Sequence, residues 1–461
     1  MDGSPLHREV LAPSIEVLQR LEADNQLNDS EKYALGHLCN WLQEVSEANN
    51  IDDANLDESA LSYLKSYKES YSRKKPLPAD SGGVIGSSRR VILNFLTMCH
   101  RLRKHRLRLV LLVFIAVQLQ LGQVLCLQTQ SLRTCSLDGE AAPLVEEVSQ
   151  IDNWNTFNVF QVGTLSKGSP LETVTLALFA RHDLLDKLKI PYDRLRHFVR
   201  DIERAYNNNP YHNNIHAADV TQTLGCFLAN DQFAQKLTDL EIASMIFATC
   251  IHDVGHPGVS NDFLINTRNE TALVYNDVSV NENMHLATAF KILRRPGNDL
   301  MEHLSPEHYR FFRRTVIQIV LATDMAGHSE LLQAFNANLK LLGPDLGAWG
   351  ADQRNLALRM CVHCADIANP AKPLPLALQW TERVVTEFFN QGDAEKKRGI
   401  PVSPLCDRDK VEVPKSQLAF LTYVVKPTFE ALKGLAPVTA GNALDNIDIA
   451  VRHWEQQVVP V

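Results

Sequence analysis

Several features that mark unusual classes of protein are missing from this chain. Its 461 residues include only 21 glycines and 21 prolines, while 45% are hydrophobic and 22% are charged. These proportions exclude a collagen-like, low-complexity or wholly disordered protein. Basic residues are not in excess either, because the formal net charge is −8. Without a global positive field to attract phosphates, nucleic acid is not an expected partner.

Cysteine is also scarce, with nine residues at irregular spacings. An odd number of cysteines in so long a chain does not form a disulfide framework and favours reduced thiols. Cys361 and Cys364 have the spacing of half a zinc finger, but the sequence contains no second such pair. No structural zinc is therefore predicted, and a reducing, cytoplasmic location is expected.

Acidic residues are absent from residues 81–137, which sets this stretch apart from the rest of the chain. Residues 89–108 carry seven Lys and Arg, and residues 109–132 carry no charge. The uncharged segment is long enough to cross a bilayer core, which needs about 20 residues. Glutamines in its second half weaken the case for a lipid-facing helix.

Three interpretations of residues 89–132 stay open. The segment could span a membrane, form a buried or partner-binding helix, or lie with its basic flank on an anionic cytoplasmic leaflet. A span would place the residues that follow outside the cytoplasm, which conflicts with reduced thiols. The surface interpretation is consistent with both observations, and it makes a membrane surface an expected partner.

The composition divides the chain into three parts. Residues 1–75 have apolar positions at helical spacing with polar breaks, which predicts an N-terminal extension of short helices. Residues 76–141 contain a linker rich in Pro, Gly and Ser, followed by the basic and apolar stretches. In residues 142–461 apolar residues recur at spacings of three and four, and strand-like alternation is scarce. We therefore predict an all-α, multi-helix domain in this last part.

The most apolar helix is expected between Thr238 and residue 251. Thr238 and Glu241 form a capping box, and the residues that follow are almost all apolar. Such a helix cannot lie on the surface, so it should cross the centre of the domain. It would then carry His252 and Asp253, which follow it directly, into an interior site.

Imidazoles and carboxylates of the right kind for metal binding occur near this helix and at two distant positions. Two histidine pairs have four-residue spacing, which places both members on one helix face. Each histidine taken singly would be an ordinary core residue, but buried unpaired carboxylates are costly without a cation. The candidates are His212, His216, His252, Asp253, His256 and Asp366.

Two imidazoles with two carboxylates suit a divalent transition metal, and carboxylate with water suits a second, harder ion. Two such metals about 3.5 to 4 Å apart can clamp a phosphate and activate a shared water, which predicts phosphoester hydrolysis. The leaving alkoxide would then need a proton from a histidine that does not bind metal.

Seven sequence blocks, in one order, resemble the catalytic domain of the class I cyclic nucleotide phosphodiesterases. The similarity runs from about residue 153 to residue 454. The blocks are YHNNIHAADVTQT from Tyr211, HDVGHPGVSNDFLINT from His252, SVNENMHLATAF from Ser279, LATDM from Leu321, CADIANPAKP from Cys364, QWTERVVTEFFNQGD from Gln379 and SQLAFLTYVVKPTFE from Ser416.

The resemblance implies a central two-metal site with assigned roles. Asp253 would bridge the first, zinc-like ion to a second ion, magnesium or manganese. His212 matches the general acid for the departing O3', and Glu282 matches the carboxylate that orients it. The implied ligands of the first ion are His216, His252, Asp253 and Asp366.

The same resemblance implies how the substrate is held. Gln417 matches the glutamine that hydrogen-bonds the purine edge, and Phe420 with Val384 matches the apolar clamp on the base. The remaining implied residues are His256 and Thr323, which hold water around the second metal, and Asn369, Tyr211 and Trp380, which contact the nucleotide or line the pocket. Two departures stand out, because Gly255 replaces an acidic residue of many relatives and Met284 replaces a second histidine.

The predicted function is hydrolysis of a 3',5'-cyclic nucleotide to the 5'-nucleotide by a two-metal-activated hydroxide, which ends a cyclic nucleotide signal. Cyclic AMP is expected over cyclic GMP, because Asn369 is the residue type that cyclic-AMP-selective relatives carry. Two alternatives remain: a catalytically silent regulatory or scaffold protein, and a non-cyclic phosphohydrolase of the wider HD type, which would lack the block with Gln417 and Phe420. The sequence leaves the regulator and the oligomeric state undetermined, with a homodimer among the options.

Overall fold

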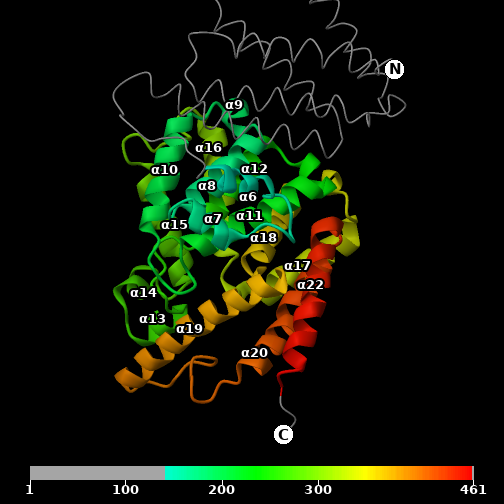
Figure 1. Ribbon diagram of the computed structural model, residues 1–461. Coiled ribbons are helices and arrows are strands. Elements are labelled where there is room, and N and C mark those ends of the chain that lie inside the picture. Colours follow the sequence, from blue (N-terminus) through cyan, green and yellow to red (C-terminus); the bar gives the residue numbers. More distant parts are fainter. Residues whose placement is uncertain (1–140, 459–461) are drawn as a thin grey trace, which may run out of the picture. The chain divides into compact units, whose positions relative to one another are not determined.

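The computed structural model describes residues 141–458, and within this range the chain forms helices and no strand (Figure 1). The prediction of an all-α domain is confirmed for this part. The α-helices are α6 (Ala141–Ser149), α7 (Val159–Leu165), α8 (Pro170–Arg181), α9 (Leu184–Lys187), α10 (Tyr192–Ala205), α11 (Asn214–Asn230), α12 (Asp239–Ile251), α13 (Asn261–Asn266), α14 (Glu270–Val274), α15 (Val280–Leu293), α16 (Pro306–Leu321), α17 (His328–Leu342), α18 (Ala351–Asp366), α19 (Leu374–Arg398), α20 (Val413–Phe420), α21 (Lys426–Leu432) and α22 (Pro437–Glu455).

Shorter helical segments connect these elements. They are the 3-10 helices η3 (Gln232–Lys236), η4 (Met325–Gly327), η5 (Leu346–Ala348) and η6 (Asn369–Ala371), and the π-helix η7 (Leu421–Val425). The described residues belong to one compact unit, residues 140–461. The predicted N-terminal extension and the stretch at residues 89–132 lie outside the described residues, so their structure and the proposed membrane association stay predictions. Between residues 141 and 458, no helix is both long enough and apolar enough to cross a membrane.

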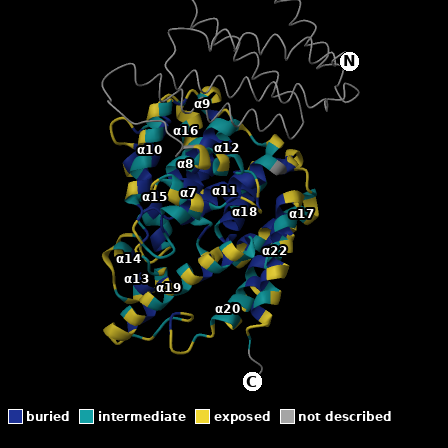
Figure 2. Cartoon of the chain, in the orientation of Figure 1, coloured by how far each residue is buried: buried dark blue, intermediate teal, exposed yellow. Residues whose placement is uncertain are grey.

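Helix α12 lies at the centre of this unit, as its composition predicts. Every residue from Glu241 to Ile251 is buried, and the helix packs against α8, α11, α16 and α18 (Figure 2). The capping box is present, because the Glu241 amide donates to Thr238 Oγ1 at 3.2 Å and the Thr238 amide donates to Glu241 Oε2 at 2.7 Å. A satisfied N-terminus and an apolar surface on all sides thus explain an interior helix.

Aromatic rings fix the helices around α12. Phe247 of α12 stacks on Phe198 of α10, with ring centroids 4.9 Å apart, and meets Phe312 of α16 edge-on at 5.0 Å. Each such pair contributes about 0.5 to 1.5 kcal/mol beyond the area it buries. These contacts fix α10, α12 and α16 relative to one another around Phe247, just over one helical turn before His252.

Helix α19 runs obliquely below this central group, with α13 and α14 near one of its ends (Figure 1). Helix α20 lies below α19 in Figure 1 and packs beside α22. Helix α19 begins after Pro373 and ends at Arg398, and the Gly399 that follows has a φ of +68°, which is favourable for glycine after a helix. The buried polar residues of α19 include Thr381, Glu387 and Gln391.

Gly392 allows the chain after α19 to return against the helix. A Cβ atom at this position would lie 1.9 Å from the carbonyl oxygen of Cys406. The returning segment is also held by Glu395, which accepts hydrogen bonds from the Ser403 amide at 2.7 Å and the Ser403 hydroxyl at 2.5 Å. The backbone therefore approaches α19 at a distance that only glycine permits.

We predict that Gly392→Ala destabilises the domain, because the new methyl group meets a backbone carbonyl that cannot rotate away. Overpacking of this kind costs about 1 to 3 kcal/mol. Gly441→Ala in α22 is the matched control, since nothing lies within 4 Å of its added Cβ. That variant should gain about 0.5 to 1 kcal/mol from helix propensity. Chemical unfolding of both variants measures the difference, and equal stabilities would contradict the close approach.

Candidate functional site

The ends of three helices bring together side chains that are far apart in sequence. His216 lies in the first turn of α11, His252 and Asp253 follow the last residue of α12, and Asp366 is the last residue of α18. One side-chain atom from each residue lies within 4.8 Å of the others. His216 Nε2 is 3.0 Å from Asp366 Oδ1, and His252 Nε2 is 3.1 Å from Asp253 Oδ2.

Local hydrogen bonds orient these side chains. Asn213 caps α11 by accepting from the amides of Ile215 and His216, so the first turn that carries His216 is fixed. The Nδ1 atom of His252 lies 2.8 Å from the carbonyl oxygen of Thr249, to which it donates. His252 Nε2 is therefore the ring nitrogen directed into the cluster, where His216 Nε2 lies 3.3 Å away.

Burial and mutual charge control the ionisation of the cluster. Burial would lower the pKa of His252, but the carboxylates of Asp253 and Asp366 outweigh it and raise this pKa well above its usual value. Burial would raise the pKa of Asp366, yet His252 and His216 lower it. The two buried carboxylates of the cluster are therefore stabilised by positive charge beside them.

This set of atoms fits a divalent cation. Two carboxylate oxygens and two imidazole nitrogens converge, and two Nε2 atoms 3.3 Å apart gain little from facing each other. The Nδ1 atom of His216 is buried and has no hydrogen-bond partner in the described part of the chain. Nitrogen and carboxylate ligands in this number are those of zinc and similar metals. His216, His252, Asp253 and Asp366 could therefore hold such an ion.

The position of Glu282 is a correction to the sequence analysis. Its carboxylate accepts a hydrogen bond from Asn261 Nδ2 at 3.0 Å, and it does not orient His212. Glu387 of α19 does so instead: it contacts His212 Nδ1 directly and accepts from the His212 amide at 3.1 Å. The sequence did not distinguish the two because both are glutamates in blocks that resemble the family.

The pair of His212 and Glu387 has the ionisation of a proton donor. Burial would lower the pKa of His212, but Glu387 and the more distant Asp253 raise it to about 9. The imidazole is therefore protonated at neutral pH, with Nδ1 facing Glu387. Its ring stacks on His256, with centroids 3.9 Å apart. Burial and His212 together lower the pKa of His256 well below its usual value, so His256 is neutral.

Glu282 lies on α15, and Thr323 lies just after the end of α16. Burial, reinforced by Asp324, raises the pKa of Glu282 to about 7. The hydroxyl of Thr323 donates to the carbonyl oxygen of Val320 at 2.7 Å, so its lone pairs remain as acceptors. Gly255, one of the departures from the family, has a φ of +77°, which glycine adopts without strain in the turn after α12.

Tyr211 and Trp380 form an aromatic wall beside the cluster of two histidines and two aspartates. The Tyr211 ring lies 4.5 Å from that of His216 and meets Trp380 edge-on at 5.7 Å. The Tyr211 hydroxyl hydrogen-bonds Asn369 Oδ1 directly. Asn369 Nδ2 in turn donates to Asp219 at 2.7 Å. Because a carboxylate only accepts, the amide of Asn369 is fixed with its oxygen toward Tyr211.

Gln417 and Phe420 lie on α20, and Val384 lies on α19. Gln417 Oε1 is 3.3 Å from the hydroxyl of Thr381, which links α20 to α19. That hydroxyl also lies 3.0 Å from the carbonyl oxygen of Ala377, and it has a single proton to donate. Gln417 is thus held less firmly than Asn369. Phe420 packs partly buried against the hydrophobic core.

Sequence reasoning missed four residues that the structure places at the site. His285 Nε2 lies 3.6 Å from Asp253, and Lys372 is a buried cation 3.2 Å from Asp219. Glu387 lies three residues after Val384, on the same side of the predicted helix. A charged residue on this apolar side was the signal that could have pointed to Glu387. The missed residues are Asp219, His285, Lys372 and Glu387.

Comparison with known proteins agrees with this geometry. The sequence profile described as 3'5'-cyclic nucleotide phosphodiesterase matches residues 211–447, just over half of the chain. A rat (Rattus norvegicus) protein named 3',5'-cyclic-AMP phosphodiesterase 4C is 43% identical over 326 residues, which cover 69% of this chain. A mouse (Mus musculus) protein of the same name is 42% identical over the same length. The matched regions span 60% and 47% of these two curated relatives.

We predict that Asp366→Asn weakens metal binding, because the neutral amide removes one of two negative charges that face the histidines. Elemental analysis of the purified full chain should show bound divalent metal in the wild type and a clear loss in this variant. Asp445→Asn, an exposed position on α22, is the matched control and should keep the metal. Retention of metal by Asp366→Asn would contradict the assignment of this cluster.

Proposed function

Because the chain belongs to the 3',5'-cyclic nucleotide phosphodiesterase family, we propose that it hydrolyses a 3',5'-cyclic nucleotide to the 5'-nucleotide and prefers cyclic AMP. The observation that carries the proposal is the protonated pair of His212 and Glu387 beside a buried cluster of two histidines and two aspartates. Catalysed hydrolysis of a phosphodiester bond uses both bound cations and a proton for the leaving oxygen.

The four-residue cluster would hold the first metal, which we propose to be zinc, and Asp253 would extend to a second, magnesium or manganese. When bound, such ions supply Lewis-acid stabilisation of the phosphate and a water of lowered pKa. Asp253 suits a shared role because its second oxygen, Oδ1, is directed toward His285 at 3.6 Å. His256 and His285 are both buried on this side of Asp253.

His212 would supply the proton. Its Nδ1 faces Glu387, so the opposite nitrogen, Nε2, carries the proton that O3' of the ribose takes as the phosphorus–oxygen bond breaks. A pKa of about 9 keeps this proton on the imidazole at neutral pH. General acid catalysis of this kind contributes about 10²- to 10⁴-fold to the rate.

The preference for cyclic AMP rests on the fixed amide of Asn369. Asp219 takes its N–H group and the Tyr211 hydroxyl takes one lone pair of its oxygen, so the second lone pair can accept from the exocyclic amino group of adenine. Guanine carries a carbonyl oxygen in that place, and two acceptors would then face each other without a hydrogen bond. Each unmade hydrogen bond in a buried site costs about 1 to 3 kcal/mol. The names of the rat and mouse relatives support the same choice.

The proposal is tested by assaying the purified full chain with cyclic AMP and cyclic GMP, with and without a chelator. We expect hydrolysis of both, a kcat/KM at least about fivefold higher for cyclic AMP, and loss of activity with chelator. Re-addition of zinc and magnesium should restore the rate. No hydrolysis of either nucleotide would contradict the enzymatic function, while equal kcat/KM values would contradict only the role of Asn369.

A second prediction concerns pH. Glu387→Gln removes the carboxylate that raises the pKa of His212, and burial then lowers this pKa from about 9. Because His212 acts in its protonated form, the alkaline limb of the kcat profile should move to lower pH. Glu382→Gln, an exposed position on the same helix, should leave the profile unchanged. An alkaline limb that stays in place in Glu387→Gln would show that His212 does not donate the proton.

A further inference from the structure

Two asparagine side chains connect the loop before α11 to the loop after α12. Asn209 Nδ2 donates to the carbonyl oxygen of His212 at 3.0 Å and to that of His256 at 2.7 Å. Asn207 Nδ2 donates to the carbonyl oxygens of Gly255 at 3.2 Å and His256 at 2.9 Å. The amide of Asn209 thus touches both the segment that carries His212 and the segment that follows the metal ligands.

The chemistry of this bridge requires an asparagine. Two backbone carbonyl oxygens face one group, and a primary amide offers two N–H donors in one plane. An aspartate would place acceptors against both carbonyls. The space is also limited, because a Cβ atom on Gly258 would lie 3.0 Å from Asn209 Oδ1. The side chain of Asn209 is therefore fitted between the two loops.

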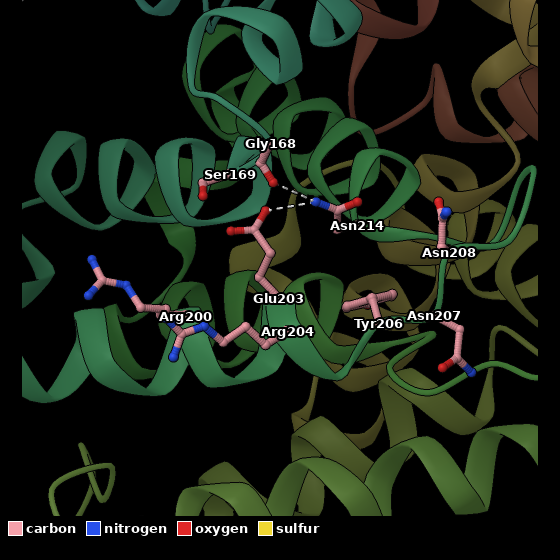
Figure 3. A pocket seen from close by; sticks show the side chains of 9 residues that line it. All are labelled: Gly168, Ser169, Arg200, Glu203, Arg204, Tyr206, Asn207, Asn208 and Asn214. Atoms are coloured by element: carbon pink, nitrogen blue, oxygen red, sulfur yellow. Dashed lines mark hydrogen bonds between the residues drawn. The ribbon is translucent and has the colours of Figure 1, made fainter.

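The neighbouring asparagines are placed differently. Asn207 and Asn208 are exposed and line a polar cavity of about 310 Å3, which also includes Glu203 and Tyr206 (Figure 3). In this view the amide of Asn207 is directed away from Glu203. Water in the cavity can replace the hydrogen bonds of Asn207, whereas Asn209 is half-buried and does not line the cavity.

His212 is also held by α19 and, through the next residue Asn213, by the start of α11. Glu387 accepts from the amides of Tyr211 at 2.8 Å and His212 at 3.1 Å, and it contacts His212 Nδ1. These bonds set the imidazole relative to α19 but not relative to the loop that follows His252 and Asp253. The position of the proton donor relative to the loop after α12 therefore depends on the amide bridge at Asn209 and on the stacking of His212 on His256.

From this geometry we propose that Asn209 is a positioning residue, which holds His212 at a fixed distance from the metal-ligand loop so that its proton reaches the leaving oxygen. The inference rests on the proposed function, because it assigns His212 as the proton donor. Asn209 touches neither substrate nor metal in this role. Misplacement of a reacting group by about 1 Å can cost up to 10²-fold in rate.

The test compares two substrates for Asn209→Ala: cyclic AMP, and the analogue in which sulfur replaces the bridging 3' oxygen. Water attacks phosphorus in both, and the bond from phosphorus to the 3' atom breaks. The 3' oxygen must take a proton from His212 as it leaves, whereas sulfur leaves as a stable thiolate without one. We expect kcat for cyclic AMP to fall by roughly 10-fold or more, and kcat for the sulfur analogue to change by less than about twofold.

Two further measurements and two further variants separate positioning from general damage. KM for cyclic AMP and the metal content from elemental analysis should both stay at the wild-type level in Asn209→Ala. Asn208→Ala should behave as the wild type on both substrates. Asn207→Ala removes two hydrogen bonds to the same loop but none to His212, so it should lower kcat less and without dependence on the leaving atom.

The outcomes are distinct. Equal losses on the oxygen and sulfur substrates, or equal effects of Asn207→Ala and Asn209→Ala, would overturn the proposal, as would wild-type kcat in Asn209→Ala. Failure of the proposed function has another signature, which is a wild-type chain that hydrolyses neither substrate. His212→Ala provides the reference, because it should show the same dependence on the leaving atom as Asn209→Ala, with a larger loss on cyclic AMP.

Discussion

The burial of two carboxylates beside two imidazoles is the constraint on which the rest of this structure depends. Asp253 and Asp366 can remain charged in the interior only because His216 and His252 lie about 3 Å from them. An unpaired buried charge of this kind would cost several kcal/mol. The helices that carry these residues must therefore end at one point, which explains why α11, α12 and α18 pack together at the centre.

Two histidines next to this cluster differ in their protonation state. His212 is protonated because Glu387 lies beside it, while His256, stacked against the same ring, is neutral because burial and the charge of His212 disfavour a second proton. Two imidazoles in contact are thus assigned different states by what each one faces. At neutral pH only the protonated ring can give up a proton, which agrees with the role proposed for His212.

The backbone is shaped to keep these groups in place. Gly255 permits the turn after α12, Gly392 permits the chain after α19 to return against the helix, and Asn209 bridges the loops that carry His212 and His256. At Gly392 the reason for the residue type is steric, at Gly255 it is a positive φ, and at Asn209 it is the need for two N–H donors. The precision of the site therefore comes from loops and helix ends whose geometry local propensity does not specify.

The sequence by itself determined the helical class, the capped apolar helix that crosses the centre, and the residue types of the metal cluster, because periodicity, capping and ligand chemistry are local properties. Only the tertiary structure decided which glutamate serves His212: Glu387 arrives from α19, 175 residues away, while Glu282 hydrogen-bonds Asn261. The same holds for Asp219 and Lys372, which meet across 153 residues of chain to fix Asn369. Pairings between distant segments depend on how helices pack, and a single sequence carries no local signal of that.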